Sequence, residues 1–221
     1  MDIKLHYIEK GEGFPLILLH GNGEDHSYFV HQIEYFSKSR RVIAIDTRGH
    51  GQSPRGVAPF TIKQFAEDLL AFMDEHQIGK ADILGFSDGG NIALTFALKH
   101  QDRINKLILN GANLFPKGVK TSVQIPIIIG YHLAKLLGGK KKAELLGLMV
   151  NEPRIIPADL NMVSVPTLII VGKNDMIKIY HSKMISDSLP NSTLSVVPGD
   201  HFIANKSPTQ FNDIVNKFLI D

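Results

Sequence analysis

The sequence predicts an α/β fold, with a mostly parallel sheet of about seven strands, helices on both faces and a small helical cap. Two observations support this prediction. Apolar runs of strand length alternate along the chain with segments of helical periodicity, which is the pattern of a parallel sheet covered on both sides. A composition of 43% hydrophobic and 21% charged residues is ordinary for one globular domain of 221 residues. We therefore expect residues 1–221 to form a single domain.

Seven apolar runs account for the predicted strands. They cover residues 3–8, 16–19, 42–45, 81–84, 104–110, 165–171 and 193–197. Helical patterns lie between and after them, at residues 27–36, 61–73, 91–98, 177–188 and 208–219. Thr61 and Gln64 have the spacing of a capping box at the start of the second of these helices.

The most informative motif is Gly85-Phe86-Ser87-Asp88-Gly89-Gly90, which lies between the fourth predicted strand and a helix. A G-x-S-x-G sequence in this position is typical of a nucleophile elbow, a strained turn that lifts a serine hydroxyl above the sheet. Side chains at Gly85 or Gly89 would collide with the neighbouring strand or helix. The motif therefore predicts Ser87 as a nucleophile.

A serine hydroxyl needs a base to remove its proton, and the base needs an acid to orient it. Asp175 and His201 each follow a predicted strand, and the order Ser…Asp…His is the one expected when the serine is on such an elbow. The carboxyl ends of parallel strands share one rim, where ligands bind in open α/β sheets. We therefore predict Ser87, His201 and Asp175 as nucleophile, base and orienting acid.

A glycine-rich turn, His20-Gly21-Asn22-Gly23, follows the second predicted strand. Such a turn offers backbone N–H groups to a developing oxyanion, so we predict the donors to be the backbone of Asn22 and of Asp88. His20 is expected to support this loop by hydrogen bonding. Gly21 and Asp88 are further predicted to contact the substrate.

The carboxylate of Asp88 has two possible roles. It could turn back to nearby backbone donors or an arginine, or it could bind an ammonium group of the substrate.

These motifs resemble those of the α/β-hydrolase superfamily over nearly the whole chain. Residues 46–53, Asp-Thr-Arg-Gly-His-Gly-Gln-Ser, are similar to the family's D-x-R-G-x-G-x-S loop. The Ser-Asp-Gly-Gly elbow is similar to that of the arylesterase and biphenyl-hydrolase-like group. The resemblance implies a serine hydrolase that cleaves a small carboxylic ester through an acyl-enzyme. It leaves open a carbon–carbon bond or lactone hydrolase with the same triad, and a hydrolase-fold ligand receptor without turnover.

The alternation of strands and helices breaks at about residues 112–160, where this family inserts a cap over the active site. Residues 126–137 are predicted as a helix with Pro126 at its first position, and residues 140–149 as a second. So short an insertion predicts a small cap and a small acyl pocket. Seven Lys/Arg stand here against three Asp/Glu, which a solvated surface or an attraction for anionic substrates or interfaces would explain.

Several classes of function are disfavoured. A net charge of +2 gives no global field for nucleic acid, and the absence of cysteine excludes disulfides and thiol catalysis. No apolar run reaches the ~20 residues that span a bilayer, and no leader pattern opens the chain. We expect no cofactor and no metal, a cytoplasmic location, and a monomer or homodimer. Four further histidines are expected to be surface or core residues: His26, His31, His132 and His181.

Overall fold

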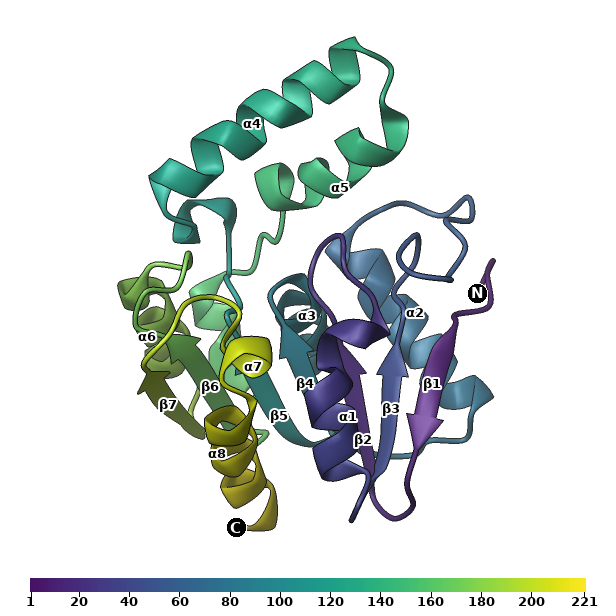
Figure 1. Cartoon of the computed structure of the whole chain (residues 1–221), viewed down its shortest axis with the longest axis vertical. Coiled ribbons are helices and arrows are strands. Elements are labelled where there is room, and N and C mark those ends of the chain that lie inside the picture. Colours follow the sequence, from purple (N-terminus) through teal and green to yellow (C-terminus); the bar gives the residue numbers. More distant parts are fainter.

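A computed structural model describes all 221 residues and contains one seven-stranded sheet (Figure 1). The strands are β1 (Tyr7–Lys10), β2 (Pro15–Leu19), β3 (Arg41–Ile45), β4 (Ala81–Phe86), β5 (Ile104–Asn110), β6 (Thr167–Gly172) and β7 (Ser192–Val197). Their spatial order is β1-β3-β2-β4-β5-β6-β7; β1 is antiparallel to β3, and all other neighbours are parallel. The predicted fold class and number of strands are confirmed.

The first strand is the least accurately predicted one. It begins at Tyr7 rather than at Ile3. The preceding residues are engaged elsewhere, because the side chain of Asp2 binds Arg48 and that of His6 binds Asp46. Local alternation in the sequence cannot show these long-range contacts.

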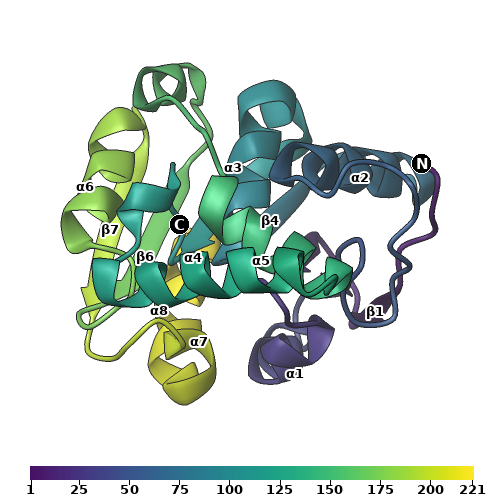
Figure 2. The ribbon, with the colours of Figure 1, turned by 90° about the horizontal axis from the view of Figure 1, so that it is seen from above.

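Helices cover both faces of the sheet (Figures 1 and 2). They are α1 (Val30–Phe36), α2 (Ile62–Glu75), α3 (Asp88–His100), α6 (Ile179–Ser188), α7 (Ile203–Lys206) and α8 (Pro208–Ile220). Helices α1, α7 and α8 lie on one face, and α2, α3 and α6 on the other. Half of the predicted capping box of α2 is confirmed, since the Thr61 hydroxyl accepts from the N–H of Gln64 at 3.1 Å. The Gln64 side chain does not return to Thr61 but donates to Asp68 at 3.0 Å. No helix has the length and apolarity needed to cross a membrane.

The hydrophobic core is divided by the sheet into two clusters. Leu16 and Leu18 of β2 belong to the cluster beneath α1 and α8, whereas Ile17 and Leu19 belong to the cluster beneath α2 and α3. Successive strand residues face opposite sides of a sheet. Because both sides are covered, the strand appears in the sequence as one continuous apolar run.

Helices α4 (Thr121–Leu136) and α5 (Lys140–Asn151) form a hairpin beyond the carboxyl ends of the parallel strands (Figure 1). We call these residues, 121–151, the cap hairpin. The prediction that Pro126 begins the first helix is wrong, because α4 starts at Thr121 and contains Pro126. The proline removes only the hydrogen bond that would reach the carbonyl of Ser122, an exposed residue in the first turn, so the helix tolerates it.

The loop after β3 is held by a buried arginine. The Arg48 side chain is fully buried and makes two hydrogen bonds of 2.7 Å to the carboxylate of Asp68 on α2. Its outer N–H groups reach Asp2, which is 27% exposed, at 2.6 and 3.1 Å. These bonds fix the N-terminal segment and the loop after β3 to α2.

We expect Asp68→Ala to lower the free energy of unfolding by about 3 kcal/mol, because it leaves the Arg48 guanidinium buried without its main partner. Asp2→Ala removes a more exposed partner and should cost clearly less. Urea unfolding of both variants checks this ranking. Equal losses in the two variants would show that the burial of the Arg48–Asp68 pair does not determine how much it contributes to the free energy of unfolding.

Candidate active site

Ser87 lies on a strained turn between β4 and α3. Its backbone has φ 52° and ψ −119°, in the left-handed half of conformational space that residues other than glycine rarely occupy. A Cβ atom on Gly85 would lie 2.3 Å from the Gly89 carbonyl oxygen, and one on Gly89 would lie 2.0 Å from the Leu19 carbonyl oxygen. The two glycines therefore allow α3 to start directly against β4 and β2.

The structure brings the predicted nucleophile, base and acid together. His201 Nε2 lies 3.0 Å from Ser87 Oγ, and His201 Nδ1 lies 2.7 Å from Asp175 Oδ1. The same oxygen of Asp175 also accepts from the N–H of Ile177 at 2.8 Å. Asp200, the sequence neighbour of His201, turns instead to Lys206. A continuous hydrogen-bond chain thus runs from a buried carboxylate to the serine hydroxyl.

Strand topology explains this convergence. Ser87 follows β4, Asp175 follows β6 and His201 follows β7, and these strands are parallel members of one sheet. The loop of residues 20–24 follows β2, which is hydrogen-bonded to β4 in the sheet. All four segments leave the sheet at its carboxyl edge, below the cap hairpin (Figure 1).

The loop after β2 is held by a buried histidine, as predicted. His20 Nδ1 donates to the Gly21 carbonyl at 2.7 Å, and His20 Nε2 accepts from the N–H of Thr47 at 3.0 Å. Burial lowers the pKa of His20 to about 4, so the ring is neutral near pH 7. The N–H of Asn22 donates to no protein group. That of Asp88 is at the open N-terminal end of α3, where helix N–H groups lack partners within the helix.

Glu24 belongs to the same loop and was missed by the sequence analysis. Its Oε2 accepts from the N–H of Gly21 at 3.1 Å. Burial raises the pKa of this carboxyl to about 7, although the Gly21 N–H and the nearby His201 oppose the shift. An acid in a Gly-Asn-Gly-Glu turn is ordinarily a surface residue, so no signal in the sequence marked it.

Asp88 is 8% exposed, and its carboxylate turns away from solvent. Its Oδ2 accepts from the side-chain amide of Asn22 at 2.9 Å, and its Oδ1 from that of Asn91 at 3.1 Å. The predicted partners, backbone donors or an arginine, are therefore wrong, because two neutral amides take their place. Burial raises the pKa of Asp88, while the two amides act in the opposite direction.

The cap hairpin contacts the site through the same asparagine. The Asn22 amide also donates to the carbonyl of Leu145 in α5 at 2.8 Å. Nearby, the Arg55 guanidinium makes hydrogen bonds of 2.8 and 3.1 Å to the carboxylate of Glu144. Helix α5 is thus hydrogen-bonded to both the loop after β2 and the loop after β3.

A cavity of about 440 Å³ lies between the cap hairpin and the body of the protein. Its lining mixes aromatic, small and charged side chains, and Ser87 is not among them. The lining includes Phe60, Tyr131, Ala143, Glu144 and Glu152.

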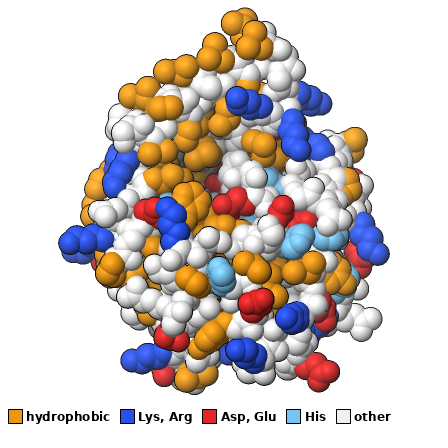
Figure 3. Space-filling model, in the orientation of Figure 1, with side chains coloured by type: hydrophobic (Ala, Val, Ile, Leu, Met, Phe, Trp, Pro, Cys, Tyr) orange, Lys and Arg blue, Asp and Glu red, His pale blue; other side chains and the backbone are white.

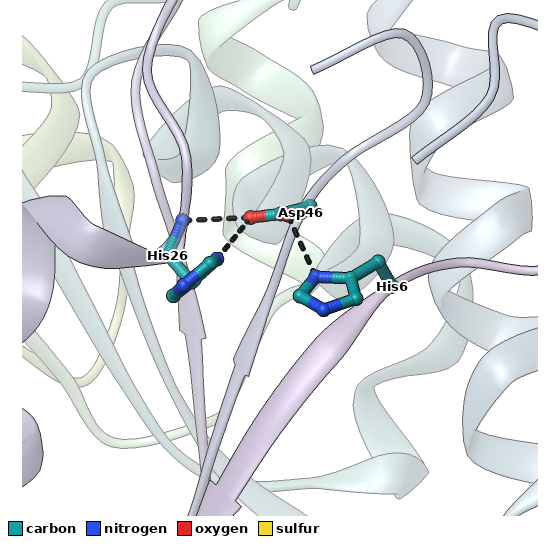
Figure 4. A group of neighbouring side chains, drawn as sticks. All are labelled: His6, His26 and Asp46. Carbon is teal, nitrogen blue, oxygen red and sulfur yellow. Dashed lines mark hydrogen bonds and ion pairs between the residues drawn. The ribbon is translucent and has the colours of Figure 1, made fainter. Parts of the chain in front are cut away.

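One cluster away from Ser87 has the residue types of a metal site. His6, His26 and Asp46 offer ligand atoms that all lie within 4.8 Å of one another (Figure 4). The Asp46 carboxylate already accepts four hydrogen bonds of 2.7–2.9 Å, from both imidazole Nδ1 atoms and from the N–H groups of His26 and Gln52. Four bonds fill the usual capacity of a carboxylate, so the cluster is satisfied as a hydrogen-bond network. The sequence analysis missed it because its members come from three separate segments.

The alpha/beta hydrolase fold family matches residues 15–129. The chain is 28% identical to the "Serine hydrolase BPHL" of Mus musculus, over 98% of this chain and 83% of that protein. It is 26% identical to a 3-oxoadipate enol-lactonase of Acinetobacter baylyi, over 99% and 94% of the two chains.

A solved structure gives the same result for the fold. A thermophilic esterase from Thermogutta terrifontis superposes with a TM-score of 0.82 at 24% identity, covering 98% of this chain and 94% of its own. Of the two sequence relatives, one is named a serine hydrolase and the other an enol-lactonase. The matched family model and the similar chains together place this protein in the alpha/beta hydrolase fold family.

Proposed function

We propose that this protein is a serine hydrolase that cleaves small carboxylic esters through an acyl-enzyme intermediate. The observation that carries the proposal is the chain of short contacts from Asp175 through His201 to Ser87, with distances of 2.7 and 3.0 Å. A nucleophile, a base and an orienting acid within hydrogen-bond reach are the requirement for acyl transfer. A ligand receptor of this fold would instead bind such an ester without turnover.

In this mechanism Ser87 Oγ attacks the ester carbonyl carbon while His201 Nε2 takes the hydroxyl proton. Asp175, which accepts from Nδ1, holds the ring in orientation and stabilises the imidazolium. The imidazolium then gives its proton to the leaving alcohol as the ester C–O bond breaks. A water molecule, deprotonated by His201, then attacks the acyl carbon. The bond from that carbon to Ser87 Oγ breaks, His201 returns the proton to Oγ, and the carboxylic acid is released.

The oxyanion formed in both steps is proposed to bind the N–H groups of Asn22 and Asp88. The Asn22 N–H has no acceptor in the protein, and the Asp88 N–H begins α3, where the helix dipole favours negative charge. Such a donor typically contributes about 100- to 1,000-fold to kcat. Gly21 is proposed to contact the substrate through van der Waals contact only, because its N–H already donates a hydrogen bond to Glu24.

The amide partners of Asp88 support a structural role for its carboxylate. Both oxygens are occupied, by Asn22 and Asn91, and the side chain is nearly buried. We propose that Asp88 positions the Asn22 loop beside the elbow. The alternative, an ammonium group of the substrate on this carboxylate, would have to reach a side chain that is only 8% exposed.

Lactone hydrolysis is the second candidate, because one full-length relative is an enol-lactonase. A lactone is a cyclic ester, so the same residues would carry out the same steps, with the alcohol still tethered to the acyl group. Carbon–carbon bond cleavage needs, in addition, protonation of a carbon leaving group.

The ester proposal predicts turnover of short p-nitrophenyl esters. We expect kcat/KM for the acetyl and butyryl esters to exceed that for the palmitoyl ester by at least about 10-fold, because we propose that the short cap leaves room for a small acyl group only. Initial rates below the critical micelle concentration test this. A larger kcat/KM for a lactone or a carbon–carbon substrate than for any ester would reassign the reaction.

The raised pKa of Glu24 predicts a pH dependence of stability. The carboxyl titrates at about 7 in the folded protein against an ordinary value of 4.5, so the folded state holds its proton more tightly. Its stabilising contribution is therefore present below about pH 4.5 and is lost as the pH rises to about 7. Glu24→Gln has no such titration. Relative to this variant, the free energy of unfolding of the wild type should fall by about 2 kcal/mol between pH 4.5 and 7, a figure reduced for the partial exposure of Glu24.

Urea unfolding at several pH values measures this difference. Glu34→Gln, at an exposed position of α1, is the matched control and should follow the wild type. If the free energy of unfolding depends on pH in the same way for the wild type and Glu24→Gln, Glu24 does not have a raised pKa.

A further inference from the structure

The outward face of α4 is largely apolar, interrupted by the exposed Ser122 and His132, which is unusual for a helix on a protein surface. Four aliphatic side chains at spacings of four, four and three residues lie on this face, and a fifth follows the helix. Their exposed fractions are 51% for Ile125, 54% for Ile129, 51% for Leu133, and 80% each for Leu136 and Leu137. We call these five residues the α4 stripe.

The opposite face of α4 is also apolar. Ile127, Ile128, Tyr131 and Ala134 are partly or fully buried, and α4 packs against α5. A surface helix normally presents polar residues to water, and one that is apolar all round is normally covered on both sides. Figure 3 shows hydrophobic side chains along the upper edge of the molecule, where α4 lies. The stripe therefore has the composition of a covered surface.

Charges beside the stripe are all positive. No Asp or Glu occurs from residue 112 to residue 143, whereas six lysines do: Lys117, Lys120, Lys135, Lys140, Lys141 and Lys142. None of the six forms an ion pair, since the paired lysines are Lys99 and Lys206. The first acid, Glu144, is engaged by Arg55. The partner of the stripe must therefore combine apolar groups with negative charge.

We propose that the α4 stripe and the following lysines dock on an anionic lipid surface. Leu136 and Leu137 would enter the boundary between headgroups and acyl chains, and Lys140–Lys142, just beyond the glycines of the hairpin turn, would contact anionic headgroups. An apolar helix face flanked by lysine is the chemistry of helices that lie in a membrane interface. The hairpin that carries the stripe also contacts the site, because the Asn22 amide donates to the carbonyl of Leu145 in α5.

A second copy of the chain fits the stripe less well. Two antiparallel α4 helices would place Lys140–Lys142 of one copy near Lys117 and Lys120 of the other, so that like charges meet. A 16-residue helix offers a face of roughly 24 by 10 Å. The area of this face is far below the roughly 800 Å² that each partner of a stable dimer buries.

Vesicle cosedimentation tests this proposal with the full-length protein. We expect binding to vesicles of phosphatidylglycerol and phosphatidylcholine, and at least about 10-fold weaker binding to pure phosphatidylcholine. Leu136→Ser/Leu137→Ser should weaken binding to the anionic vesicles by about 10-fold or more through lost apolar contact. Lys140→Gln/Lys141→Gln/Lys142→Gln should also weaken binding to the anionic vesicles, because it removes the attraction to the headgroups. The binding that this variant retains should depend less on salt concentration than that of the wild type.

Matched controls lie at the other end of the molecule. Ile220→Ser changes a 71% exposed aliphatic residue near the C-terminus, and Lys38→Gln/Lys80→Gln/Lys217→Gln removes three exposed lysines. Both controls should bind like the wild type, and thermal unfolding should show that every variant is folded. Absence of binding, equal binding to neutral vesicles or equal weakening by the controls would overturn the proposal. So would a dimer in light scattering that Leu136→Ser/Leu137→Ser dissociates, because a second copy would then cover the stripe.

Discussion

The close approach of α3 to β2 and β4 is the constraint on which the rest of the site depends. It exists because Gly85 and Gly89 have no Cβ; either added atom would lie 2.3 Å or less from a backbone carbonyl oxygen. This approach forces the turn at Ser87 into its unfavourable conformation, with φ 52°. The burial of β4 on both faces of the sheet, and of α3 on one of them, supplies the stabilisation that offsets this strain. The serine hydroxyl is thereby presented to His201 without any rearrangement.

A network of polar side chains connects the turn at Ser87 to the cap hairpin. Asn113 and Asn91 exchange hydrogen bonds of 2.8 and 3.1 Å, Asn91 donates to Asp88, and Asn22 joins Asp88 to the carbonyl of Leu145. Each member is nearly or partly buried and has partners, which is the condition under which buried polar groups add rigidity rather than cost. The proposed oxyanion donors lie on two segments that this network ties together. The same network joins α5 of the cap hairpin to the loop after β2.

Much of the fold could be predicted from the sequence, because strands buried on both faces give continuous apolar runs and the covering helices give a 3.6-residue period. The three residues of the proposed triad were also recognisable, since each follows such a run, and parallel strands end at one edge. The remainder depends on contacts between distant segments. The amide partners of Asp88, the carboxyl of Glu24 against the Gly21 N–H, and the His6–His26–Asp46 cluster leave no local pattern. The start of α4 before Pro126 was missed because a proline near a helix N-terminus is tolerated at more than its first position.

The central claim is that Ser87, His201 and Asp175 act as one unit, and a double-mutant cycle tests it most directly. Ser87→Ala and His201→Ala are each expected to remove nearly all of kcat/KM for p-nitrophenyl butyrate, because neither residue can act without the other. The double variant is then expected to lose little more than either single one, and all three proteins should unfold at similar urea concentrations. Losses that multiply in the double variant would mean that the two residues act independently, and they would contradict the proposed mechanism.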